Sequence, residues 1–306
     1  MKKLILLVDF LRRNMPVSGE IVLNFAGNDI RWHTNGDDGV ATQLYYGQSF
    51  ENTDLRLFQI ISEKATCILD VGAFSGLYSV VGALKNSNAR IFTFEPSSIA
   101  VKRIEQNLRL NRITNVTLIE SAVGAQNGKI NFYIPKNDSI STVSSVNEKF
   151  TVRKSNEGVK ESKRTKVLQK SVPITTLDSF AEKHELSNIE LIKIDVETHE
   201  MAVFEGARKI LEKYNPVIIV EIFLNEERKK FFNSFTRELG YYPYLITNDG
   251  IVRLDNGLIP NYGGCNYLFS KKKTKYVYST LSNKDWNVIN ELTDIGDSDQ
   301  LQVIGR

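Results

Sequence analysis

Short apolar runs and amphipathic stretches alternate along most of the chain. Five runs have the length and composition of buried strands: residues 67–69, 90–94, 116–119, 191–194 and 216–220. Between them, residues 97–111 and 198–211 repeat apolar side chains at the spacing of one helix face. This alternation of strands with helices predicts an α/β fold.

The pattern ahead of the first strand indicates a small cap. Residues 20–25 and 30–33 alternate apolar and polar positions around a Gly-Asn-Asp turn, which predicts a hairpin, followed by a polar loop and a helix over residues 52–64. In the first fourteen residues, Asp9 interrupts an apolar run too short to span a bilayer. We expect an amphipathic helix packed on the domain there, with peripheral membrane contact as the alternative.

A glycine turn and a carboxylate follow the first strand at a spacing that suits an adenosine ligand. Gly72 and Gly76 lack Cβ atoms, so backbone amides and a helix N-terminus can approach a ligand at this turn. Nineteen residues after Gly76, the next strand ends at Glu95, whose carboxylate can accept two hydrogen bonds from a ribose diol.

The spacing of the glycines distinguishes between two adenosine cofactors. A dinucleotide site has the pattern G-x-G-x-x-G, whereas this turn reads D-x-G-x-x-x-G, with Phe74 where the middle glycine would stand. Asp70 suits a ligand that carries an amino group and a sulfonium better than one with two phosphates. The turn therefore favours S-adenosylmethionine, and an NAD-dependent Rossmann oxidoreductase is the alternative.

The sequence DVGAFSGLYS, which begins at Asp70, and the sequence FEP, which begins at Phe94, resemble motifs of the FkbM family of class I S-adenosylmethionine-dependent methyltransferases. The resemblance spans residues 43–269 and implies a doubly wound, mostly parallel, seven-stranded Rossmann-like sheet, closed by antiparallel strands at residues 242–246 and 266–269. It implies cofactor contacts from Asp70, Gly72, Ala73, Phe74, Gly76, Glu95, Ser121, Ala122 and Asp195. The expected parts are a cap over residues 1–64, a methyltransferase domain over 65–270 and a polar tail over 271–306.

Acidic side chains gather at the ends of the next two buried strands. Asp195 ends the strand 191–194, Glu197 and His199 follow it directly, and Glu221 ends the strand after it. Because ligands bind at the carboxyl ends of the strands in open α/β sheets, we expect these four residues to face the reacting methyl group. Asp195 or Glu197 is the preferred proton acceptor, and His199 is the alternative base.

The same stretch departs from the pattern D-V-E-G-x-E of the family that it resembles, because Thr198 stands at the glycine. This departure favours a catalytically silent binding module as a second alternative. The chain also lacks the Asn/Asp-Pro-Pro-Tyr/Phe sequence of enzymes that methylate exocyclic base nitrogens or glutamine amides. The resemblance therefore implies O-methylation of a sugar, a glycan precursor or a secondary metabolite.

Oxygen ligands at these strand ends raise the question of a metal. Asp195, Glu221 and Asn225 could together bind Mg²⁺, as in catechol-type methyltransferases. We expect a divalent metal to be dispensable.

The charge and the cysteine content of the chain limit the kinds of partner and the cellular compartment that we expect. Lys and Arg number 39 against 36 Asp and Glu, a formal net charge of +3, which does not indicate a nucleic-acid partner. Residues 148–171 contain most of the clustered basic side chains and are expected to form a mobile loop, either solvated or a lid for an anionic acceptor such as a phosphorylated sugar. The two cysteines, Cys67 and Cys265, are isolated, so we expect a cytoplasmic protein.

Overall fold

The computed structural model describes residues 15–47, 52–136, 144–157, 165–247, 250–259 and 266–272. The helix expected in the first fourteen residues, Cys265 and the tail from residue 273 lie outside the described residues. Within the described ranges, no helix has the length and apolar character that crossing a lipid bilayer requires.

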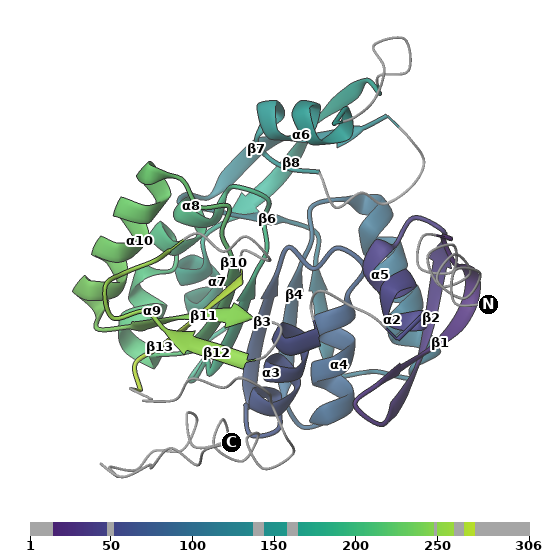
Figure 1. Ribbon diagram of the computed structural model, residues 1–306, viewed down its shortest axis with the longest axis horizontal. Helices are drawn as coiled ribbons and strands as arrows, with labels where there is room; N and C mark the ends of the chain where they lie inside the picture. The colour runs from purple at the N-terminus through teal and green to yellow at the C-terminus, as the bar shows by residue number, and fades with distance from the viewer. Residues whose placement is uncertain are drawn as a thin grey trace, which may run out of the picture.

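A sheet of eight strands organises the described part of the chain (Figure 1). In spatial order its strands are β12 (Gly250–Arg253), β11 (Tyr242–Thr247), β13 (Asn266–Ser270), β10 (Val217–Glu221), β9 (Leu191–Ile194), β3 (Cys67–Val71), β4 (Arg90–Phe94) and β5 (Val116–Ile119). From β10 to β5 neighbouring strands are parallel, and β13 runs antiparallel between β10 and β11. The strand order reverses at β3, so the doubly wound prediction is confirmed; β12 is an eighth strand, paired with β11.

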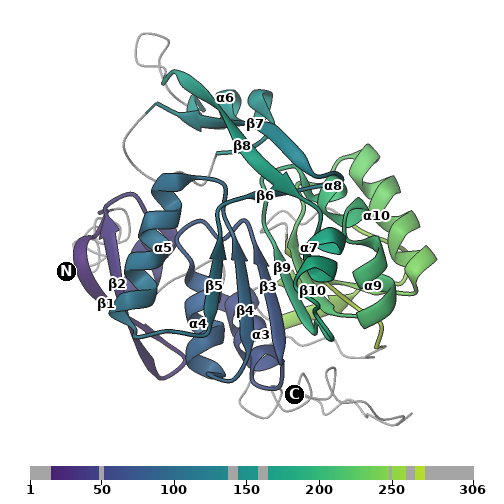
Figure 2. The same ribbon diagram turned by 180° about the vertical axis from the view of Figure 1, so that it is seen from behind.

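Helices cover both faces of this sheet, and its central strands are correspondingly buried along their whole length. One face carries α3 (Asn52–Ser62), α4 (Leu77–Lys85) and α5 (Ser98–Leu110). The other face carries α7 (Leu177–Lys183), α8 (Glu200–Glu205), α9 (Arg208–Tyr214) and α10 (Glu226–Leu239), as Figure 2 shows. Neighbours on β3 illustrate the alternation, since Ile68 belongs to the first apolar cluster and Leu69 to the second.

The cap contains the expected hairpin and one helix that was not predicted. β1 (Ser18–Phe25) and β2 (Asn28–Asn35) pair antiparallel. The expected polar loop instead contains α2 (Gly39–Tyr45), whose N-cap Asp38 accepts a hydrogen bond from the backbone N–H of Ala41. Side chains of the hairpin, α2 and α3 belong to the same apolar cluster as the first face of the sheet. The described part of the cap therefore shares its apolar core with the sheet.

A second, smaller sheet lies beyond the carboxyl ends of the central strands (Figures 1 and 2). Its strands, in spatial order, are β6 (Ala122–Val123), β8 (Val167–Thr175) and β7 (Gly128–Pro135), and α6 (Glu148–Ser155) packs beside β7. We call these four elements the inserted layer.

The inserted layer corrects the prediction of a basic loop over residues 148–171. Glu148–Ser155 form α6, and residues 167–171 belong to β8, while residues 158–164 lie outside the described residues. Only Phe150 and Thr151 of α6 are buried. One buried apolar side chain among polar and basic ones gave too weak a periodicity for a helix to be predicted.

Candidate active site

A cavity lies at the carboxyl ends of β3, β4 and β9, where doubly wound sheets bind ligands. All predicted cofactor residues except Gly76 line it: Asp70, Gly72, Ala73, Phe74, Glu95, Ser121, Ala122 and Asp195. Glu197 and His199 line it as well, and Glu221 lies beside Glu197. Further wall residues were not predicted: Val40 and Ser75, Lys193, and Phe132, Ser144 and Val146 near or in the inserted layer.

Backbone geometry requires both glycines of the turn. Gly72 has a φ of +81°, and a Cβ there would lie 1.8 Å from the carbonyl oxygen of Asp195. Gly76 has a φ of +86°, and its Cβ would lie 2.9 Å from the Ile104 side chain of α5. The missing Cβ atoms therefore admit neighbouring parts of the chain, rather than the ligand alone as the sequence suggested.

Glu95 is buried at the end of β4, with 6% of its surface exposed. Its two carboxylate oxygens accept hydrogen bonds from the backbone N–H groups of Phe74 and Ser97, at 2.9 and 2.8 Å. Burial raises the pKa of Glu95 to about 7, although these hydrogen bonds lower it. Each oxygen keeps acceptor capacity for a ligand hydroxyl, because a carboxylate oxygen has two lone pairs.

Asp70 and Lys193 are paired across β3 and β9, and both are buried. Asp70 accepts hydrogen bonds from the backbone N–H and the hydroxyl of Ser79, at 3.1 and 2.5 Å, while burial raises its pKa to about 6. The ammonium of Lys193 lies 3.4 Å from a carboxylate oxygen of Asp195 and 5.0 Å from the centre of the Tyr78 ring. Lys193 was not predicted as a site residue from the sequence. A charged residue within an apolar strand is nevertheless a signal of a functional site that the sequence shows, and Lys193 lies on the same face of its strand as Asp195.

All three predicted catalytic carboxyl groups converge beside this lysine. Oxygen atoms of Asp195, Glu197 and Glu221 lie within 4.8 Å of one another. Burial and the charge of Asp195 raise the pKa of Glu197 to about 9, and the same causes raise the pKa of Glu221 well above its usual value. Glu197 is therefore protonated at neutral pH, whereas Asp195 forms an ion pair with Lys193.

His199 precedes α8 and lines the same cavity. In the described part of the chain its Nε2 atom is buried without a hydrogen-bond partner, and burial lowers the pKa of the imidazole. A neutral imidazole with an unpaired nitrogen can accept a proton or a hydrogen bond. His199 therefore remains a candidate base, as the alternative to Asp195.

The predicted metal ligands are brought together only in part. Asp195 and Glu221 are neighbours, but the side-chain oxygen of Asn225 caps α10 by accepting a hydrogen bond from the N–H of Arg228 at 2.8 Å. Glu197 supplies the third carboxyl group instead. Three carboxyl groups offer the hard oxygen ligands that Mg²⁺ prefers, and a metal at this site remains a hypothesis.

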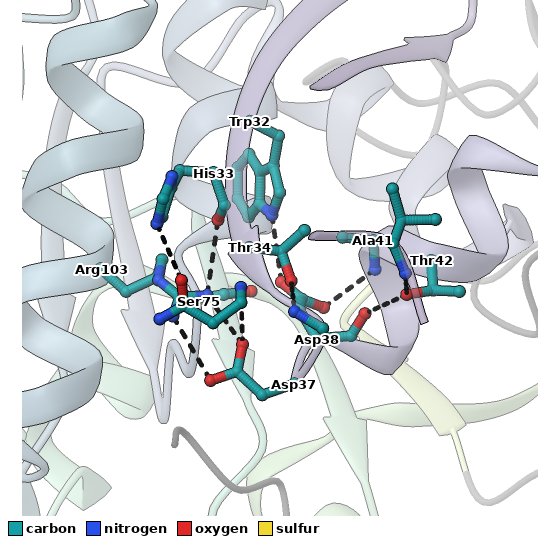
Figure 3. A network of polar contacts seen from close by, with 12 residues as sticks. Trp32, His33, Thr34, Asp37, Asp38, Ala41, Thr42, Ser75 and Arg103 are labelled. Atoms are coloured by element: carbon teal, nitrogen blue, oxygen red, sulfur yellow. Dashed lines mark hydrogen bonds and ion pairs between the residues drawn. The ribbon is translucent and has the colours of Figure 1, made fainter. Parts of the chain in front are cut away.

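A buried polar network connects the cap to the glycine turn (Figure 3). Asp38 is 1% exposed, accepts a hydrogen bond from Nε1 of Trp32 at 3.0 Å, and is also hydrogen-bonded to the side chain of Ser75. Next to it, Asp37 and Arg103 form a buried ion pair at 2.9 Å. Because Ser75 lines the cavity, the network fixes one cavity wall through residues of the cap.

Asp38→Ala is expected to lower the free energy of unfolding by about 2–4 kcal/mol, because several buried donors lose their acceptor. Urea unfolding followed by circular dichroism measures this change. Asp29→Ala, at the exposed turn of the β1–β2 hairpin, is the control and should remain within about 0.5 kcal/mol of wild type. Equal stabilities of the two variants would contradict the role assigned to Asp38.

Residues 70–243, more than half of the chain, match the family model described as Methyltransferase FkbM domain. Over 144 residues the chain is 25% identical to Methyltransferase 1 of Beauveria bassiana (strain ARSEF 2860), a match that covers 45% of this chain and 57% of that protein. The chain is thus matched to little more than half the length of this curated relative.

Two of the solved structures that match this chain are described as methyltransferases. Methyltransferase FkbM from Methylobacillus flagellatus KT has 12% identity and a TM-score of 0.45, covering 76% of this chain and 55% of that chain. The O-methyltransferase from Bacillus cereus in complex with SAH has 15% identity and a TM-score of 0.39, covering 71% of this chain and 78% of that chain.

Proposed function

Because the chain belongs to the FkbM methyltransferase family, we propose that it transfers a methyl group from S-adenosylmethionine to a hydroxyl oxygen of a sugar, a glycan precursor or a secondary metabolite. The observation that carries the proposal is the cavity, in which the predicted cofactor residues of β3 and β4 meet the predicted catalytic residues after β9.

The residues that line the cavity fit this cofactor. Among the described residues that line it, four carboxyl groups face one ammonium group: Asp70, Glu95, Asp195 and Glu197 against Lys193. Even with Glu197 protonated, three carboxyl groups face this one ammonium group, and such a surplus suits a ligand with a sulfonium and an amino group and disfavours a pyrophosphate. Glu95 would hold the ribose, and Ser121 and Ala122 would lie against the adenine.

When bound, S-adenosylmethionine supplies a methyl group on a positively charged sulfur. The chain must hold the acceptor oxygen at attack distance, exclude water and take up one proton. We assign the proton to Asp195, because it stands as an ion-paired carboxylate at the cavity wall. Glu197 and Glu221 would orient the acceptor by hydrogen bonds, and His199 is the alternative base.

Cofactor binding is expected to depend on Glu95 and on pH. Glu95→Gln should weaken the affinity for S-adenosylhomocysteine at least about tenfold at pH 8, because charge-assisted hydrogen bonds to the ribose are lost. In the wild type the ionised carboxylate is the binding form, so affinity should fall as the pH drops through about 7, where Glu95 takes up its proton. Calorimetric titration between pH 5.5 and 8.5 measures both effects.

The variant serves as its own pH control. Between pH 8 and 6 the Glu95→Gln protein should lose less affinity than the wild type, and the remaining loss should reflect other groups such as Asp70. Identical pH profiles for the two proteins would remove Glu95 from the ribose site.

Two experiments test the function as a whole. Calorimetry with S-adenosylhomocysteine and with NAD should show binding of the first alone, and the reverse result would restore the oxidoreductase alternative. Methyl transfer from radiolabelled S-adenosylmethionine to a cell extract should label a product whose linkage is an O-methyl ether. Cofactor binding without any labelled product from suitable extracts would favour the silent binding module.

The charge of the acceptor and the cellular location of the protein stay predictions. A phosphorylated or otherwise anionic acceptor is less compatible with the acidic cavity than a neutral one, unless its charge lies outside the cavity near α6. The expected cytoplasmic location agrees with Cys67, which is a free and buried cysteine.

A further inference from the structure

The turn that carries Glu197 has a backbone conformation that L-residues rarely adopt. Glu197 has a φ of +50°, and Thr198, next to it, has a φ of +82°. A β-branched residue at positive φ is a conformational outlier, and such outliers persist only where the surrounding structure holds them. A glycine at position 198 would adopt this conformation without strain.

Hydrogen bonds to Thr198 and to its neighbour explain how the turn is held. The backbone N–H of Thr198 donates to the carboxylate of Glu200 at 2.7 Å. The hydroxyl of Thr198 accepts a hydrogen bond from Nδ2 of Asn147 at 3.0 Å, and the hydroxyl of Ser145 donates to the carbonyl oxygen of Glu197 at 2.6 Å. The last two bonds come from the segment of residues 144–157, which contains α6.

The orientation of Asn147 is fixed by its second role. Its Oδ1 atom accepts a hydrogen bond from the N–H of Phe150 at 3.1 Å and so caps α6. With Oδ1 used in the cap, Nδ2 is directed to Thr198. A side chain without a hydroxyl at position 198 would leave this amide without that acceptor.

The 144–157 segment forms part of the cavity wall. Ser144 and Val146 line the cavity, together with Phe132 of β7. Ser145, between them, is 1% exposed and also pairs with Tyr133 of β7 through two backbone hydrogen bonds of 2.8 and 3.1 Å. Any shift of this segment against the turn would therefore change the shape of the cavity next to Glu197.

We propose that Thr198 is a positioning residue: its hydroxyl holds the 144–157 segment against the turn of Glu197 and thereby fixes the acceptor-side wall of the cavity. The name "acceptor-side" rests on the proposed methyl transfer, whereas the contact itself does not. A glycine at position 198 would leave the turn free of strain but unattached, whereas the threonine attaches the turn to the inserted layer by a side-chain hydrogen bond.

Three substitutions at one position separate the hydroxyl from the backbone strain. Thr198→Ser keeps both the hydroxyl and the Cβ, Thr198→Ala keeps the Cβ alone, and Thr198→Gly removes both. Amide hydrogen exchange of peptides within residues 144–157 should be unchanged in the serine variant and about fivefold faster in the alanine and glycine variants, because one hydrogen bond is lost. Asn147→Ser, which keeps a cap for α6 but is too short to reach Thr198, should match the alanine variant.

The thermal midpoints should follow a different order. Thr198→Ala should melt below wild type, since it retains the strain without the bond, whereas Thr198→Gly should melt above the alanine variant because its strain is relieved. Fast exchange within residues 144–157 of the glycine variant, despite a melting temperature above that of the alanine variant, would support the proposal. Exchange that is unchanged in the alanine and glycine variants, or that follows melting temperature across the series, would overturn it.

The outcome is independent of the proposed function. The exchange experiment uses the full chain without any ligand, and the affinity of each variant for S-adenosylhomocysteine is measured separately by calorimetry. Failure of the wild type to bind S-adenosylhomocysteine would refute the methyltransferase proposal, while the exchange pattern would still decide the role of Thr198.

Discussion

Asp195→Asn is expected to reduce the turnover number for methyl transfer by about 10²–10⁴, the range that general-base catalysis contributes. The amide keeps the size of the side chain, but it cannot take the proton of the acceptor hydroxyl. The turnover number and the specificity constant should fall together, because the lost interaction acts mainly in the transition state. Initial rates of label transfer to the acceptor identified from the extract measure both constants.

Comparison with two neighbours makes this result diagnostic. Glu197→Gln should cost less than Asp195→Asn, because Glu197 is protonated at neutral pH and an amide can replace it as a hydrogen-bond donor. His199→Ala should cost no more than about tenfold if the histidine is not the base. A collapse of activity in the His199 variant, with Asp195→Asn still active, would show that the base had been assigned to the wrong residue.

Gly72→Ala is expected to destabilise the fold by more than about 4 kcal/mol and to abolish cofactor binding. The new Cβ would lie 1.8 Å from the carbonyl oxygen of Asp195, so β3 and the segment after β9 would have to separate. The residue would also need a φ of +81°, which strains any L-side chain. Thermal unfolding by circular dichroism and calorimetry with S-adenosylhomocysteine measure the two losses.

Gly240→Ala separates the two causes of this loss. Gly240 has a φ of +73° at the end of α10, but nothing lies within 4 Å of the position of its Cβ. Its replacement should therefore cost only about 1–2 kcal/mol, the conformational part alone. If both glycine variants lost the same stability, the contact between Gly72 and Asp195 would not be the cause.

Those parts of the site that stand directly at strand ends could be predicted from the sequence. Gly72, Glu95 and Asp195 each follow or end an apolar run, and a parallel sheet brings the carboxyl ends of its strands to one edge. Knowing the strands was therefore enough to predict that these residues share a cavity, although the space beside Gly72 proved to be filled by backbone.

Other features depend on partners that are distant in the sequence. Asn225 has a suitable side chain for a metal, but its oxygen is used as a helix cap, which depends on where α10 begins. Ser75 is hydrogen-bonded to Asp38 across the cap, and Thr198 to Asn147 across the inserted layer. The pattern of apolar and polar residues around Ser75 or Thr198 does not indicate these distant partners, so the two contacts could be found only in the structure.

The apolar cluster shared by the cap and the sheet has a consequence for how the protein folds. Trp32 and Phe58, both fully buried, lie ahead of residue 65, where the sequence suggests that the methyltransferase domain begins. If the chain were divided there, one face of the sheet would lose α3 and the hairpin from its apolar covering, and the cap would have nothing to pack on. Hairpin, α3 and sheet are therefore expected to melt as one cooperative unit, without a separate transition on either side of residue 65.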